Sequence, residues 1–196
     1  MKTLHTLSLA LVVLSSNPVF GSYKPIPKTC RGKLITQEIG CHDCGLIAYI
    51  NLVPWLLHHV HPDELRLAHQ RIMLEHPELK VRGPDTLKLV EIIKHEAYPL
   101  GVYPSRTTLS ALKNENQGIL LLTNKLGDYG HYVSLINTEF ISEAIYLITI
   151  LDPADPSQSI QLRLYLQPDG SGRIAQPELS GFNFVDSNFI SIDYND

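Results

Sequence analysis

The chain has 196 residues, of which 44% are hydrophobic, so it is long enough to bury a substantial core within one domain of ordinary size. Its formal net charge is -4 at pH 7, and it has neither a run rich in lysine and arginine nor interleaved basic and aromatic residues. We therefore expect no nucleic-acid partner.

Residues 1–21 have the features of a secretory signal peptide. Lys2 supplies a positive charge, Leu7 to Leu14 form an apolar region, and Val19-Phe20-Gly21 precede an expected cleavage ahead of Ser22. The apolar region is shorter than the roughly 20 residues needed to span a bilayer, and no second such stretch follows. We expect a secreted or periplasmic protein without a membrane span after signal removal, in which residues 22–196 form a single domain.

The chain contains three cysteines, Cys30, Cys41 and Cys44. An oxidising compartment would pair two of them and leave one over. We predict a disulfide between Cys30 and Cys41, which would leave Cys44 free. The alternative, a disulfide between Cys41 and Cys44, would make a redox pair. A zinc site that adds His42 is disfavoured, because His42 lies between Cys41 and Cys44 and there is no second Cys-x-x-Cys pair. We predict no metal and no cofactor.

Cys44 stands at the start of an apolar run, Gly45–Val53, which predicts a buried central helix. A thiol at a helix N-terminus is favoured as the thiolate, because unpaired backbone N–H groups and the helix dipole stabilise a negative charge there. The alternative interpretation is a packed structural cysteine beside an ordinary core helix.

Four helices are predicted in the first half of the chain: Gly45–Val53, Pro62–Glu75, one beginning at Pro84-Asp85, and Thr108–Lys113. Pro54 should kink or end the first helix, because proline lacks the N–H that a helix interior requires. In the third helix, Leu87, Val90 and Ile93 are expected to share one face. The proline-rich segment Tyr23–Lys33 is expected to be irregular.

Five strands are predicted in the second half: Gly118–Thr123, His131–Asn137, Ala144–Asp152, Ser159–Leu166 and Phe189–Asp193. Apolar and polar residues alternate in Ser159–Leu166, which indicates one face on a core and one in water. Helices followed by an antiparallel sheet define an α+β fold class.

A hairpin between two of these strands would bring His131 and Asp152 together. A turn near Ile141 and Ser142 places His131 directly opposite Asp152, with Cβ atoms roughly 5 Å apart. The carboxylate could then accept a hydrogen bond from one ring nitrogen and leave the other for a thiol proton. Taken separately, the two residues are also interpretable as a strand-end histidine and a turn aspartate.

Four short motifs resemble, in the same order, those of the papain-like bacteriocin-processing (double-glycine leader) cysteine peptidases and their stand-alone relatives. The resemblance extends over roughly Ile35 to Pro156. The motifs are Gln37, Asp43-Cys44-Gly45, Gly130-His131-Tyr132-Val133 and Leu151-Asp152-Pro153-Ala154.

The resemblance implies a papain-like fold and a site residue for each role. Cys44 would be the nucleophile, His131 the general base and acid, and Asp152 the residue that orients the histidine. Gln37 and the Cys44 backbone N–H would form an oxyanion hole, although Gln37 stands one residue farther from the cysteine than is usual. We therefore expect an exported cysteine hydrolase that cleaves peptide or protein substrates through a thioester acyl-enzyme. Leader processing is not carried over, because leader peptidases work on the cytoplasmic side of a transporter.

Two other functions fit the same residues. A deamidase or a transglutaminase-like acyl transferase could use the same triad, since fold and triad do not fix the acceptor or the leaving group. A non-catalytic exported binding domain could retain the fold without turnover.

Histidines concentrate between residues 58 and 76, where a metal site is conceivable. Three of them surround an expected helix end, and His69 and His76 are expected on a solvated helix face. No cysteine or carboxylate completes an evident tetrahedral set, so we predict no metal site there.

Overall fold

The computed structural model describes residues 22–25, 34–37, 42–57, 60–124, 127, 129–175 and 181–194. The expected signal peptide, and with it the predicted pairing of Cys30 with Cys41, lies outside these residues. The helices are α1 (Cys44–Leu56), α2 (Pro62–Glu75) and α3 (Thr86–Ala97), with short 3-10 helices η1 (Pro77–Lys80), η2 (Tyr98–Leu100) and η3 (Leu109–Ala111). The strands are β1 (Ser22–Pro25), β2 (Val102–Thr108), β3 (Gly118–Thr123), β4 (Gly130–Ser142), β5 (Ile145–Asp152), β6 (Asp155–Leu166), β7 (Gly172–Ile174) and β8 (Phe184–Tyr194).

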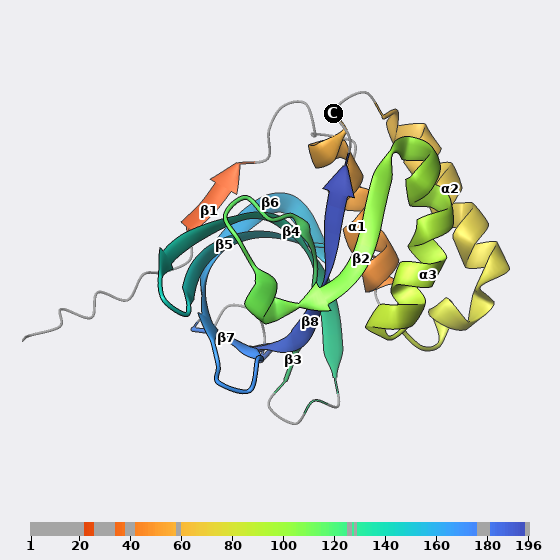
Figure 1. Ribbon diagram of the computed structural model, residues 1–196. Helices are drawn as coiled ribbons and strands as arrows, with labels where there is room; N and C mark the ends of the chain where they lie inside the picture. Colours follow the sequence, from red (N-terminus) through yellow and green to blue (C-terminus); the bar gives the residue numbers. More distant parts are fainter. Residues whose placement is uncertain are drawn as a thin grey trace, which may run out of the picture.

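The described strands form one antiparallel sheet in the order β1-β6-β5-β4-β3-β8-β2. The short strand β7 pairs with both β6 and β8, so the strands from β3 to β8 close into a ring, which Figure 1 shows in cross-section. Alternating apolar residues fill the ring, including Leu162, Leu164 and Phe189. The α+β prediction is confirmed: helices come first and pack on an antiparallel sheet, whose strands β2 to β8 follow them.

Helix α1 packs against the outside of the ring, chiefly on β4, and α2 and α3 cover it from the other side (Figure 1). Helix α1 is buried along almost its whole length, as its apolar sequence predicts. Ser134 in β4 donates a hydrogen bond of 2.7 Å to the Ala48 carbonyl and so fixes the helix on the sheet. The helix ends at Leu56, two residues after Pro54, which agrees with the predicted end.

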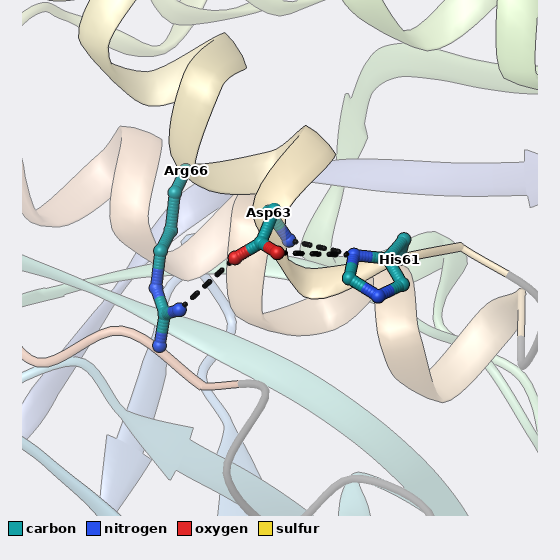
Figure 2. Close-up of polar contacts among 3 residues, drawn as sticks. All are labelled: His61, Asp63 and Arg66. Atoms are coloured by element: carbon teal, nitrogen blue, oxygen red, sulfur yellow. Dashed lines mark hydrogen bonds and ion pairs between the residues drawn. The ribbon is translucent and has the colours of Figure 1, made fainter.

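The start of α2 coincides with the predicted one. The imidazole Nδ1 of His61, the N-cap residue, accepts a hydrogen bond of 3.3 Å from the Asp63 backbone N–H. Arg66 donates one of 3.3 Å to the Asp63 carboxylate, as Figure 2 shows. The side chain of an N-cap residue thus satisfies one of the N–H groups that a helix start leaves unpaired.

The predicted face of α3 is partly wrong. Val90 and Ile93 are buried as expected, but Leu87 is 56% exposed. Leu89 takes the buried position in its place, because α3 lies between α1 and β2 and its buried face is centred closer to Leu89. Leu87 instead lines the cleft described below.

Two segments form edge strands that the sequence did not predict. Ser22–Pro25, in a segment expected to be irregular, pairs with β6. Val102–Thr108 pairs with β8, and the helix predicted for Thr108–Lys113 is reduced to the single turn η3. An edge strand needs apolar side chains on few positions, so its sequence lacks the alternation of a central strand.

The hairpin of β4 and β5 has a different turn and register from those predicted. The turn lies at Glu143 and Ala144, after two bulges in β4 that leave Ile136 and Ile141 unpaired. Near the site, Ser134 pairs with Leu151, so His131 is not directly opposite Asp152. Each bulge adds one residue to β4 and shifts the register by one.

No helix in the described residues is long and apolar enough to cross a membrane.

Candidate active site

Cys44 is the first residue of α1 and a free thiol, with 7% of its surface exposed. Gly45 follows it because the helix start is packed too closely for a side chain. A Cβ atom at Gly45 would lie 2.6 Å from Cδ2 of Leu89 and 3.0 Å from Cδ2 of Tyr132. Close packing against α3 and β4 therefore fixes the position of the thiol.

His131 lies near the start of β4 and contacts both Cys44 and Asp152. Its Nε2 is 2.7 Å from Oδ1 of Asp152, and Cys44 lies close enough to the ring to help raise its pKa. Because Nε2 faces the carboxylate, Nδ1 is the nitrogen left for the thiol. The ring of Phe182 lies beside the imidazole, with centroids 5.8 Å apart, and shields it.

Asp152 ends β5 and is held by the turn that follows. Its Oδ1 accepts a second hydrogen bond, of 2.8 Å, from the Ala154 backbone N–H. Burial raises the pKa of Asp152, but the hydrogen bond and charge of His131 outweigh it and hold the pKa below its usual value. The residue is therefore a carboxylate at neutral pH.

The pKa of His131 is raised from 6.5 to about 9. Burial acts in the opposite direction, but the hydrogen-bonding and electrostatic effects of Asp152 and Cys44 on the imidazole outweigh it. At neutral pH the imidazole is thus protonated, as an imidazolium between Cys44 and the Asp152 carboxylate.

Gln37 lies in the same cleft as Cys44 and His131, and the cleft has a volume of about 780 Å³. The Gln37 backbone N–H donates a hydrogen bond of 2.8 Å to the Pro153 carbonyl, in the turn after Asp152. The structure thus brings together all four residues that the sequence singled out as a triad and an oxyanion group.

The cleft runs between the loop before α3 and the rim of the ring of strands. Charged and aromatic side chains line it: Arg82, Asp85, Arg106, Tyr129, Tyr132, Phe182 and Asp186. Tyr132 joins the two walls, since its hydroxyl donates a hydrogen bond of 3.1 Å to the Pro84 carbonyl. Burial raises the pKa of Tyr132 to about 12, so the hydroxyl keeps its proton.

The structure adds a second histidine and aspartate pair that the sequence did not predict. Nε2 of His69, in α2, lies 2.9 Å from Oδ2 of Asp43, the residue before Cys44. Asp43 is only 4% exposed, and the His69 side chain is 22% exposed. The expectation that His69 lies on a solvated helix face is therefore wrong. His76 is also partly buried and contacts Glu78. The apolar spacing of α2 could not indicate a buried carboxylate just before the start of a neighbouring helix.

Within the described part of the chain, no three histidine, cysteine, aspartate or glutamate residues gather into a metal-binding group. Two of the clustered histidines, His58 and His59, lie outside the described residues, as do Cys30 and Cys41. The alternative disulfide between Cys41 and Cys44 is not formed, because Cys44 is a free thiol.

Comparison with known proteins gives no family assignment. No protein-family model matches the chain, and no curated protein sequence matches it. The chemistry of the site is therefore argued from its own residues.

Proposed function

We propose that this chain is an exported, papain-like cysteine hydrolase that cleaves peptide bonds. The observation that carries the proposal is the position of His131, which hydrogen-bonds Asp152 and lies beside Cys44 at the edge of an open cleft. A nucleophile, a base within hydrogen-bond reach and a group that orients the base are the parts that nucleophilic catalysis needs.

The reaction begins with a Cys44 thiolate beside the His131 imidazolium. The thiolate attacks the substrate carbonyl carbon, and the carbonyl electron pair becomes an oxyanion. The Gln37 side-chain amide and the Cys44 backbone N–H stabilise that charge. When the C–N bond breaks, Nδ1 of His131 gives its proton to the leaving amine, and a thioester remains on Cys44.

Hydrolysis of the thioester completes the cycle. The neutral His131 takes a proton from water, and the resulting hydroxide attacks the thioester carbonyl. The second tetrahedral intermediate expels the Cys44 thiolate and releases the carboxylic acid, while His131 keeps the proton and the ion pair is restored. Asp152 stays ionised throughout and stabilises the imidazolium.

A thiol-reactive epoxide tests the proposal directly. The protein beginning at Ser22 should be labelled at Cys44, and His131→Ala should slow the labelling, because the imidazolium stabilises the thiolate. Cys44→Ala should abolish turnover of a peptide library and leave the circular dichroism spectrum unchanged. Full turnover by Cys44→Ala would refute the proposal. Products one mass unit heavier than the substrate, or cross-linked to an amine, would instead identify a deamidase or a transferase.

A further inference from the structure

Asn51 is a fully buried polar residue in a helix that is otherwise apolar on this face. Its side-chain Oδ1 accepts a hydrogen bond of 2.8 Å from the Ile35 backbone N–H. Its Nδ2 donates another of 2.8 Å to the Ile35 carbonyl. The amide therefore pairs with both backbone groups of one residue, as a neighbouring strand would.

Ile35 belongs to the segment that carries Gln37 into the cleft. Its two hydrogen bonds to Asn51 anchor the segment at one end, and the Gln37 N–H bond to the Pro153 carbonyl anchors it at the other. The described residues 34–37 contain no helix or strand, so these hydrogen bonds hold the segment in place instead of regular secondary structure.

The spacing of Asn51 from Cys44 matches this arrangement. The two residues are seven apart in α1, so they lie on the same face of the helix, about 10 Å apart along its axis. A chain that starts at Ile35 beside Asn51 can advance up to about 7 Å in two residues, and the Gln37 side chain covers the rest. Gln37 and Cys44 accordingly line the same cleft.

We propose that Asn51 is a positioning residue that places the Gln37 amide at the oxyanion site beside Cys44. This inference rests on the proposed function. A buried amide carries a desolvation cost that an apolar residue at the same place would avoid, and both of its polar ends are used on Ile35. The helix that carries the nucleophile thus also sets the position of the second oxyanion donor.

Two reactions of Cys44 separate this role from a general contribution to the fold. Alkylation by iodoacetamide needs the thiolate but forms no oxyanion, whereas peptide cleavage needs both. Asn51→Asp keeps the acceptor for the Ile35 N–H and replaces the donor by an oxygen that repels the Ile35 carbonyl. We expect kcat to fall about 10-fold to 100-fold, while the rate of Cys44 alkylation changes less than about twofold.

A double-mutant cycle with Gln37→Ala tests the connection between the two residues. If Asn51 acts through Gln37, Asn51→Asp should cause little further loss of kcat once Gln37 is alanine. Ser134→Ala is the matched control, because it also removes a buried hydrogen bond to α1, but one that is made to the Ala48 carbonyl and not to the Gln37 segment. It should leave the ratio of kcat to alkylation rate unchanged.

Three results would overturn the inference: an unchanged kcat in Asn51→Asp, equal losses of cleavage and alkylation, or additive effects with Gln37→Ala. If Asn51→Asp does not fold, hydrogen exchange of the Ile35 backbone amide is measured in the unaltered protein instead. An exchange rate as fast as in an unprotected peptide would show that Asn51 does not anchor Ile35. Failure of the proposed function is distinguishable, because the unaltered protein would then show neither cleavage nor Cys44-specific labelling.

Discussion

His131 Nε2 lies 2.7 Å from Asp152 Oδ1, although the register of their strands does not place the two residues opposite each other. Continuing the pairing of Ser134 with Leu151 sets Val133 opposite Asp152. His131 precedes Val133 by two residues in β4, so the two side chains lie on the same face of the strand. The two bulges shift the register by two residues, so they preserve the shared face, which a single bulge would have reversed.

Asp152→Asn should lower kcat/KM by roughly one to four decades, because the His131 imidazolium loses its carboxylate partner. Steady-state kinetics on a peptide substrate measures the loss. Asp155→Asn is the control. Asp155 pairs with Asp152 across the turn, but it is exposed and its Oδ1 contacts only Ser157 among the described residues, so its replacement should be nearly silent. Damage by Asp155→Asn together with a harmless Asp152→Asn would disprove the proposed triad.

The pH profile should report His131. Its pKa of about 9 means that kcat/KM should fall as the pH rises through 9, when the imidazolium loses the proton that the leaving amine needs. Asp152 raises this pKa, so Asp152→Asn should move the alkaline limb to lower pH. Alkylation of Cys44 should not fall across the same limb, because it needs no proton from His131. An alkaline limb at the same pH in both proteins would contradict the assignment.

The same shift should appear in stability. His131 has a higher pKa in the folded state than its ordinary value of 6.5, so its contribution is fully present below pH 6.5 and lost as the pH rises through 9. His131→Ala should therefore flatten the decline in the free energy of unfolding between these two pH values. Urea denaturation at intervals across this range measures it, and an undiminished decline in the variant would show that other groups cause it.

His69→Ala should destabilise the fold by about 1–3 kcal/mol, because it leaves the buried Asp43 carboxylate without its hydrogen-bond partner. We expect the loss of stability to lie towards the lower end of this range, because the His69 side chain is partly exposed to water. His95→Ala is the control, since its side chain is 89% exposed and only approaches Glu96. Its effect should stay within about 0.5 kcal/mol. Equal losses of unfolding free energy in the two variants, measured by urea denaturation, would show that the pair of His69 with Asp43 stabilises the fold no more than an exposed histidine does.

Gly45→Ala should destabilise the fold by about 1–3 kcal/mol through overpacking, since the added Cβ would meet Leu89 and Tyr132 at less than normal contact distance. Leu89→Ala alone should also destabilise, by opening a cavity. The double variant Gly45→Ala with Leu89→Ala should lose less than the sum of the two, because each change relieves the other. Strict additivity in thermal unfolding would show that the two side chains do not compete for the same space.

The sequence by itself determined the elements with strong local signals. The apolar run predicted the buried helix α1, proline and acidic residues predicted both ends of α2, and alternation predicted the inward face of β6. The motifs around Cys44, His131 and Asp152 also singled out residues that are adjacent in space. Such signals succeed because backbone capping and side-chain periodicity act within a few residues.

Only the tertiary structure decided how those elements meet. The edge strands β1 and β2, the closure of the ring through β7 and the bulged register of β4 depend on partners far away in sequence. Likewise, Asn51 is one polar residue in an apolar run, and His69 one of several histidines, until folding brings Ile35 and Asp43 beside them. A buried polar group requires a hydrogen-bond partner, and the sequence alone does not show which residue the packing will bring beside it.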